Sequence, residues 1–451
     1  MSTSTCSLRE YTSRPEDLFA LCDEEFLSLV RGDFEDELRR LKWAYSVGGR
    51  DGPRPKSKSP SIILYGQDYD EVNRTLVGLL TLKWIYNKQY DTVVANQAEA
   101  LRLSRESFEK MHNFYTESFT NPNELYALIT SIVVNDIGKD KELAMDYEKK
   151  TGHRISHLNH DMILIKAVKA GLVRCMESDR LSQEDRDDII HGMELGADFN
   201  FGQLAQAENV PACLASLLTM RGHARSFRLR FEEQLLDIAG AAGHLDWTCA
   251  KKLTQSNFDS YNTVYQAGIS IISSGLSLRE GYDLVLKRRL DLLTTKNFRE
   301  LELNDPDDRA LARLLCMGSV ADLTAAQLYR RAWTSLESNV RQFLRKSLNI
   351  DGSVAEPAVQ VTYIPALLTQ AVDAGGPGPL EMKERAMRSV LHYLYRVMAA
   401  PGKPDGPVSV IERNVLSTLK EVVQTSEFRK DPTILERAAI PECQAAMTEK
   451  N

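Results

Sequence analysis

The sequence predicts an all-α fold, built as one large helical bundle-like domain with irregular loops. Apolar residues recur at spacings of three to five along most of the chain, which is typical of the buried face of a helix. Residue types that cap helices precede several of these runs. Only residues 359–364 have the composition of a strand, and this segment is short.

The first half of the chain shows these signals most clearly. Residues 15–45 predict one or two amphipathic helices. The Gly-, Pro- and Ser-rich stretch 48–61 follows and predicts a flexible linker. Asn121 and Pro122 suit the cap and first position of a helix, because Asn accepts free amide bonds and Pro needs no amide partner there. Ser182 with Asp185 predicts another helix start.

The second half carries further helical runs, interrupted at residues 304–308, 351–379 and 400–407. We divide the chain into N-terminal helices (1–47), the linker (48–61), a helical core that holds the candidate site (62–300), and a C-terminal helical region packed on that core (301–451).

Composition excludes several classes of function. A formal net charge of −7 gives no general attraction to nucleic acid, so no nucleic-acid partner is expected. The 7 cysteines show no CxxC spacing, which favours a reducing compartment. The chain has no uninterrupted apolar run of about 18 residues, so no membrane span is predicted. We therefore expect a cytoplasmic protein, and the sequence leaves its oligomeric state open, a homodimer included.

The first segment with chemical potential is VVNDIGKD at residues 133–140. Asn135 and Asp136 carry the oxygen ligands that Mg²⁺ prefers, and Lys139 has the charge to contact a phosphate. The segment resembles the helix ending in His-Asp-x-Gly-Lys of HD-domain metal phosphohydrolases, with Asn135 in place of the histidine. The alternative is a helix end whose buried aspartate only bonds a backbone amide.

The second segment is HRISHLNHD at residues 153–161, in which four of the nine residues are His or Asp, in a chain with only 8 histidines. His160 and Asp161 are its candidate metal ligands. The alternative is that Asp161 is only the N-cap of the apolar helix that follows. Two weaker candidates from the HD pattern are His112 and Asp237, either of which is also compatible with a structural role.

Positive charge suited to an anion lies in two further places. Arg221, Arg225 and Arg228 share a helix face, and residues 287–289 form a Lys-Arg-Arg triplet. Either group is also compatible with a solvated helix face. The sequence has no GxGxxG after a strand, GxxxxGK[ST], HExxH or GxSxG motif, so it does not predict a dinucleotide enzyme, P-loop ATPase, zincin or α/β-hydrolase.

Together with GADFNFGQLAQAENVP and RFEEQLLDIAGAAG, the two segments resemble the fungal unconventional class I sesquiterpene (humulene-type) synthases, which lack DDxxD. The resemblance covers roughly residues 60–300. It implies a binuclear Mg²⁺ cluster and an essential lysine at the diphosphate. The implied metal ligands are Asn135, Asp136, Asp161 and His160. Lys287 and Asp136 are the implied catalytic residues, and Lys139, Arg228 and Arg288 are further candidate contacts to the diphosphate.

The function expected on this basis is Mg²⁺-dependent cyclisation of farnesyl diphosphate to a humulene-like hydrocarbon. The alternatives are an HD-type metal phosphohydrolase and a catalytically degenerate helical scaffold. The three differ in the pocket they need: a cyclase requires a closed apolar cavity beside the metal, a phosphohydrolase an open polar cleft, and a scaffold neither.

Overall fold

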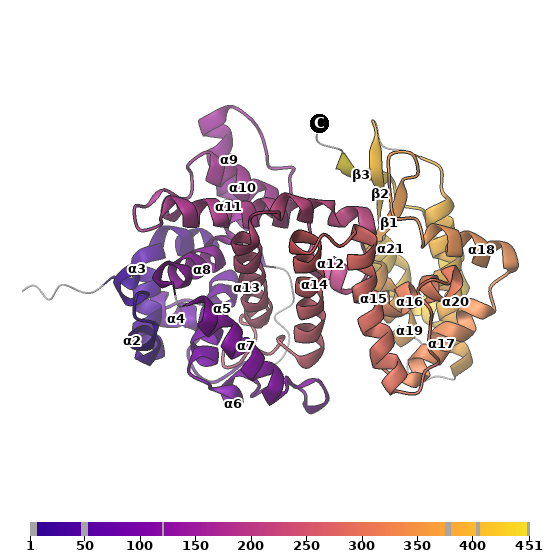
Figure 1. Cartoon of the computed structure of the whole chain (residues 1–451), viewed down its shortest axis with the longest axis horizontal. Helices are drawn as coiled ribbons and strands as arrows, with labels where there is room; N and C mark the ends of the chain where they lie inside the picture. Colours follow the sequence, from indigo (N-terminus) through magenta and orange to yellow (C-terminus); the bar gives the residue numbers. More distant parts are fainter. Residues whose placement is uncertain (1–6, 47–52, 120, 375–379, 403–405, 449–451) are drawn as a thin grey trace, which may run out of the picture. The chain divides into compact units, whose positions relative to one another are not determined.

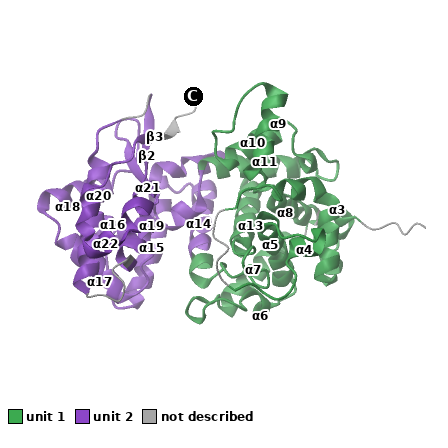
Figure 2. Ribbon diagram, turned by 180° about the vertical axis from the view of Figure 1, so that it is seen from behind, with its two compact units in different colours: residues 1–198, 222–259 green, residues 199–221, 260–451 purple. Residues whose placement is uncertain are grey.

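The computed structural model describes residues 7–46, 53–119, 121–374, 380–402 and 406–448. Helices make up most of these residues, which confirms the predicted all-α class. The chain forms two compact units, coloured separately in Figure 2. Unit 1 comprises residues 1–198 and 222–259, and unit 2 comprises residues 199–221 and 260–451.

Unit 1 is built from helices alone among its described residues. They are α1 (Leu8–Tyr11), α2 (Pro15–Ala20), α3 (Asp23–Leu41), α4 (Pro60–Tyr65), α5 (Asp70–Tyr86), α6 (Tyr90–Val93), α7 (Arg105–Ser118), α8 (Pro122–Val134), α9 (Lys141–Thr151), α10 (His160–Lys169), α11 (Gln183–Asp198), α13 (Ala224–Gly240), the first residues of α14 (Gln255–Ser273), and the 3₁₀ helices η1 (Glu99–Leu101), η2 (Ile137–Lys139) and η3 (Arg174–Glu177).

Helix α5 forms the centre of unit 1, and α13 runs beside it (Figure 1). Almost every residue of α5 from Glu71 to Ile85 is buried, as expected of a helix that is apolar on most of its circumference. Glycines let the two helices approach closely. A Cβ on Gly78 would lie 2.8 Å from the backbone oxygen of Leu236, and one on Gly240 would lie 3.0 Å from the backbone nitrogen of Gly78. The backbones of the two helices are therefore in direct contact at these glycines.

Unit 2 packs a second set of helices around Trp333, Tyr329 and Tyr393. Its elements are α12 (Phe201–Ala205), the remainder of α14, α15 (Leu278–Thr295), α16 (Pro306–Met317), α17 (Leu323–Thr334), α18 (Ser338–Ser347), α19 (Ile364–Ala374), α20 (Leu380–Ala399), α21 (Leu416–Thr418), α22 (Ser426–Lys430), the 3₁₀ helices η4 (Pro211–Met220) and η6 (Pro432–Arg437), and the π-helical turn η5 (Leu419–Val423).

A three-stranded sheet, in the order β1-β2-β3, also belongs to unit 2. Strand β1 (Ala358–Thr362) runs parallel to β2 (Val408–Asn414), which pairs antiparallel with β3 (Cys443–Thr448). The predicted strand at 359–364 corresponds to β1. Strands β2 and β3 were not predicted from the sequence.

The boundaries of the two units differ from the predicted domain ranges. The predicted core, 62–300, contributes to both units, because the chain passes between them near residues 198, 221 and 259 rather than near 300. The predicted linker, 48–61, lies partly outside the described residues, and its last two residues begin α4. Within the described residues, every helix is too short or too polar to cross a membrane.

Candidate functional site

The first predicted segment forms a sharp connection from α8 to α9. Helix α8 buries Val133 and Val134 completely, then ends at Asn135, and the short turn η2 follows. Asp140 closes this connection, since its Oδ1 accepts a bond from the backbone N–H of Glu142 at the start of α9. Asp136 is thereby held at the junction with only 7% of its surface exposed.

The second predicted segment begins α10, and its N-cap is Asn159. Asn159 Oδ1 accepts from the backbone N–H of Met162 at 2.8 Å. The alternative role of Asp161 as the N-cap is therefore wrong, and its carboxylate is left for other contacts in the first turn. Gly138 brings η2 against this helix start, because a Cβ at Gly138 would lie only 2.9 Å from the carbonyl carbon of His160.

Three of the predicted metal ligands converge here. His160 Nε2 lies 4.0 Å from Asp136 Oδ1 and 3.8 Å from Asp161 Oδ1. Neighbouring ligand atoms on an octahedral Mg²⁺, each at about 2.1 Å from the ion, lie ~3.0 Å apart, so both separations are longer than a shared ion requires. His160 and Asp161 expose about a third of their side chains, at 31% and 30%. The cluster is thus accessible from solvent.

No group of three or more His, Cys, Asp or Glu side chains that could hold a metal ion is found in the part of the chain that the structure describes. An ion shared by Asp136, His160 and Asp161 would therefore need these side chains to move closer than they stand.

Lys139 lies on the buried side of the cluster, paired with two carboxylates. Its Nζ is 2.8 Å from Asp136 Oδ2 and 2.8 Å from Glu71 Oε2, and all three side chains are buried. Burial lowers the pKa of Lys139, but the charges of Asp136 and Glu71 outweigh it, and the net shift is upward. Lys139, predicted as a diphosphate contact, is therefore a cation held inside the protein by two acids.

Arg74 extends this network on α5. Its Nη1 contacts Glu71 Oε1 at 3.0 Å. Burial lowers the pKa of Arg74, but the charges of Glu71, Asp237 and Asp136 together raise it. Asp237, the weaker candidate from the HD pattern, thus lies close enough to Arg74 to raise its pKa, as Asp136 does. Glu71 and Arg74 were not among the predicted site residues; they lie in the polar stretch DYDEVNRT at residues 68–75, where their spacing of three lets opposite charges pair on a helix.

Asn135 has a different partner from the one predicted. Its Oδ1 accepts from Arg230 Nη1 at 3.0 Å, and the same nitrogen contacts Glu233 Oε2 at 2.5 Å. A metal at Asn135 would have to displace this arginine. Burial raises the pKa of Glu233 to about 8, while Arg230 acts to lower it. Small residues on α11 admit the arginine, since a Cβ on Gly196 would lie 2.6 Å from Arg230 Nη2.

The remaining predicted contacts lie elsewhere. Arg228 donates to Glu232 Oε1 at 3.0 Å and to the carbonyl of Phe114 at 2.6 Å. His112 bonds the carbonyl of Ile85 at 3.0 Å. Lys287 and Arg288 belong to α15 in unit 2.

In unit 2, both α15 residues have partners of their own. Lys287 Nζ pairs with Asp291 Oδ1 at 2.9 Å on an exposed face, and Arg288 Nη1 donates to Ser260 Oγ at 3.0 Å. The structure thus brings together Asp136, His160 and Asp161, but it gives Arg228, Lys287 and Arg288 separate partners.

A pocket of about 680 Å³ opens beside the cluster in unit 1. Lys139 and His160 line it together with Lys141 and Arg154, whose side chains are exposed. Its other residues are Tyr45, Gly138, Asp140, Ala144, Met145, Glu148, Ser156, Leu158 and Ile163. The lining of the pocket therefore combines apolar side chains with charged ones, and Lys141 and Arg154 line the same pocket as His160.

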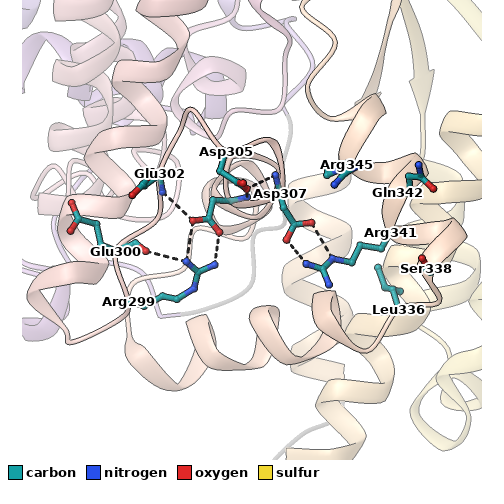
Figure 3. A pocket seen from close by; sticks show the side chains of 11 residues that line it. Arg299, Glu300, Glu302, Asp305, Asp307, Leu336, Ser338, Arg341, Gln342 and Arg345 are labelled. Carbon is teal, nitrogen blue, oxygen red and sulfur yellow. Dashed lines mark hydrogen bonds and ion pairs between the residues drawn. The ribbon is translucent and has the colours of Figure 1, made fainter.

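A second pocket, of about 790 Å³, lies in unit 2 at the start of α16 (Figure 3). Two of its arginines already have acidic partners. Arg299 pairs with Asp308, and Arg341 pairs with Asp307 through two contacts. These pairs hold α16 to its neighbours. We assign the pocket no site.

A family model described as a family of unknown function (DUF6829) matches residues 27–435. No curated protein and no solved structure matches the chain. The match covers most of both units, so the chain belongs to the DUF6829 family.

Proposed function

We propose that Asp136, His160 and Asp161 bind one divalent metal ion and that the chain hydrolyses a phosphate ester beside it. The observation that carries this proposal is the convergence of these side chains from two separate segments at a solvent-accessible position. Carboxylate oxygens and an imidazole nitrogen suit Mg²⁺ or Mn²⁺ more than a thiophilic metal.

The adjoining pocket supports a phosphorylated substrate. Lys141 and Arg154 line the pocket with their side chains exposed, and Arg154 Nε is oriented by Ser156 Oγ at 3.0 Å. Both would attract the phosphate and hold its oxygens next to His160. A bound divalent ion would polarise the phosphoryl oxygen and lower the pKa of a water molecule. Lys139 would not contact substrate directly, because Asp136 and Glu71 hold its ammonium.

Cyclisation of farnesyl diphosphate stays a second proposal, supported by the resemblance to sesquiterpene synthases. A cyclase must keep water from its carbocation in an apolar cavity. The pocket next to the cluster has the charged residues Lys141, Glu148 and Arg154 in its wall, which favours hydrolysis. Both reactions would use the same metal ligands, so one set of variants tests both.

The test uses the full chain with Mn²⁺ or Mg²⁺ and a panel of phosphate monoesters, phosphodiesters and farnesyl diphosphate. Phosphate from the monoesters, the alcohol from the phosphodiesters and any pyrophosphate are measured in the aqueous phase, and hydrocarbons are measured in an organic extract. We expect metal-dependent phosphate release that falls by at least about 100-fold in His160→Gln and Asp161→Asn, since even supporting residues of metal sites cost 10–100-fold. His157→Gln is the control, an exposed histidine in the same segment. Formation of a hydrocarbon and pyrophosphate from farnesyl diphosphate would favour cyclisation over hydrolysis. If none of the substrates is turned over, both proposals are refuted.

A further inference from the structure

The pairing of Lys139 with two acids is unusual for its degree of burial. Glu71 exposes 1% of its surface, Lys139 6% and Asp136 7%. The two carboxylate oxygens each lie 2.8 Å from one nitrogen, so they are at most twice that distance apart. Two carboxylates this close in a buried position repel one another unless a cation or a proton lies between them. Here the ammonium of Lys139 is that cation.

Nearby groups do not remove the need for it. Arg74 contacts Glu71, but through the other carboxylate oxygen, Oε1. His160 faces the other oxygen of Asp136, Oδ1. Each acid therefore presents one oxygen to Lys139 alone among the contacts found in the described residues. Without Lys139, these two oxygens would face each other in the interior.

Asp136 consequently connects two positions for positive charge. Its Oδ1 faces His160, where the proposed ion would bind, and its Oδ2 faces Lys139. In two-metal sites, ions about 3.5–4 Å apart act together on one substrate. The second position here has the oxygen donors that Mg²⁺, Mn²⁺ and Ca²⁺ accept, but a lysine fills it.

We propose that the Lys139 ammonium takes the place of a second cation between Asp136 and Glu71, so that removing its charge creates a divalent-cation site there. The inference rests on the proposed function only for the ion at His160. Binding at the Lys139 position is measured separately, as the difference in bound Mn²⁺ between variant and wild type.

The experiment counts Mn²⁺ bound per chain by calorimetry and by electron paramagnetic resonance of the free ion. Lys139→Met keeps an apolar stem of similar length and removes the charge. We expect it to bind one Mn²⁺ more than the wild type does, and we expect its Tm to rise more on addition of Mn²⁺. The double variant Lys139→Met/Glu71→Gln should lose the additional ion, because only one carboxylate then remains.

Lys83→Met is the matched control. Lys83 is also 6% exposed, but its Nζ pairs with a single carboxylate, that of Asp23, at 2.5 Å. We expect no additional ion there. Lys139→Gln serves if Lys139→Met is unfolded in metal-free buffer, and circular dichroism during Mn²⁺ titration then shows whether the ion restores the fold.

The outcomes separate this inference from the proposed function. Equal Mn²⁺ stoichiometry in the wild type and both Lys139 variants, with no Mn²⁺ effect on their Tm or fold, overturns the inference and leaves hydrolysis at His160 unaffected. A wild type that binds no Mn²⁺ and hydrolyses nothing, beside a Lys139→Met variant that binds one ion, refutes the proposed function and supports the inference.

Discussion

Replacing Gly138 with alanine tests whether the close approach of η2 to α10 builds the cluster. A Cβ at this position would overlap the carbonyl oxygen of His160, and it would lie 2.9 Å from the carbonyl carbon and 3.2 Å from Leu164 Cβ. The obstacle is backbone, which cannot rotate away as a side chain can. The two segments must therefore separate by about 1 Å, at a cost near the upper end of the usual 1–3 kcal/mol for overpacking.

For a unit of this size, 1 kcal/mol corresponds to roughly 2–4 °C in Tm, so we expect a loss of about 6–12 °C. The same shift moves His160 away from Asp136 and should weaken Mn²⁺ binding. Gly32→Ala is the control, because a Cβ in this interior position of α3 meets nothing within 4 Å. It should raise the unfolding free energy by about 0.5–1 kcal/mol. A Gly138→Ala protein with wild-type Tm and Mn²⁺ affinity would refute the packing argument.

Two further changes test the energetics of buried charge in each unit. Arg313→Met removes a guanidinium that is 1% exposed and donates to the carbonyl oxygens of Asn209 at 2.9 Å and Leu348 at 3.1 Å. Because these carbonyls lose their donor, urea denaturation should show that the unfolding free energy falls by about 3 kcal/mol. A fall of less than about 1 kcal/mol would contradict this reasoning. Glu233→Gln removes a carboxyl whose pKa burial raises from 4.5 to about 8. Since the folded state binds this proton more tightly than the unfolded chain, wild-type stability contains a contribution that is lost as pH rises between about 4.5 and 8. The variant should therefore gain stability relative to the wild type over that range, and parallel pH profiles of the unfolding free energy would show the assignment to be wrong.

Local signals predicted much of the helical framework. Asn121 caps α8 as expected, with its Oδ1 accepting from the backbone N–H of Asn123, and Ser182 caps α11 by accepting from Asp185. These contacts join residues two or three positions apart, so the sequence contains them directly. That the segments around Asp136 and His160 come together was expected only because both carry residue types that bind metal ions.

The remaining features depend on residues distant in sequence. Lys139 and Glu71 are 68 positions apart, and no local pattern connects them. Arg230 reaches Asn135 over 95 positions because glycines on α11 leave room for its guanidinium. The sheet has the same origin, since the pairing of β1 with β2 joins residues about fifty positions apart, such as Ala358 with Val410.

The most direct test of the proposed site is the number of Mn²⁺ ions bound by the wild type, His160→Gln, Asp161→Asn and the control His157→Gln, measured by equilibrium dialysis of the full chain. The account predicts one ion for the wild type and for His157→Gln, and none for the two site variants at the same free Mn²⁺ concentration. Equal binding by all four proteins, or no binding by the wild type, would contradict it.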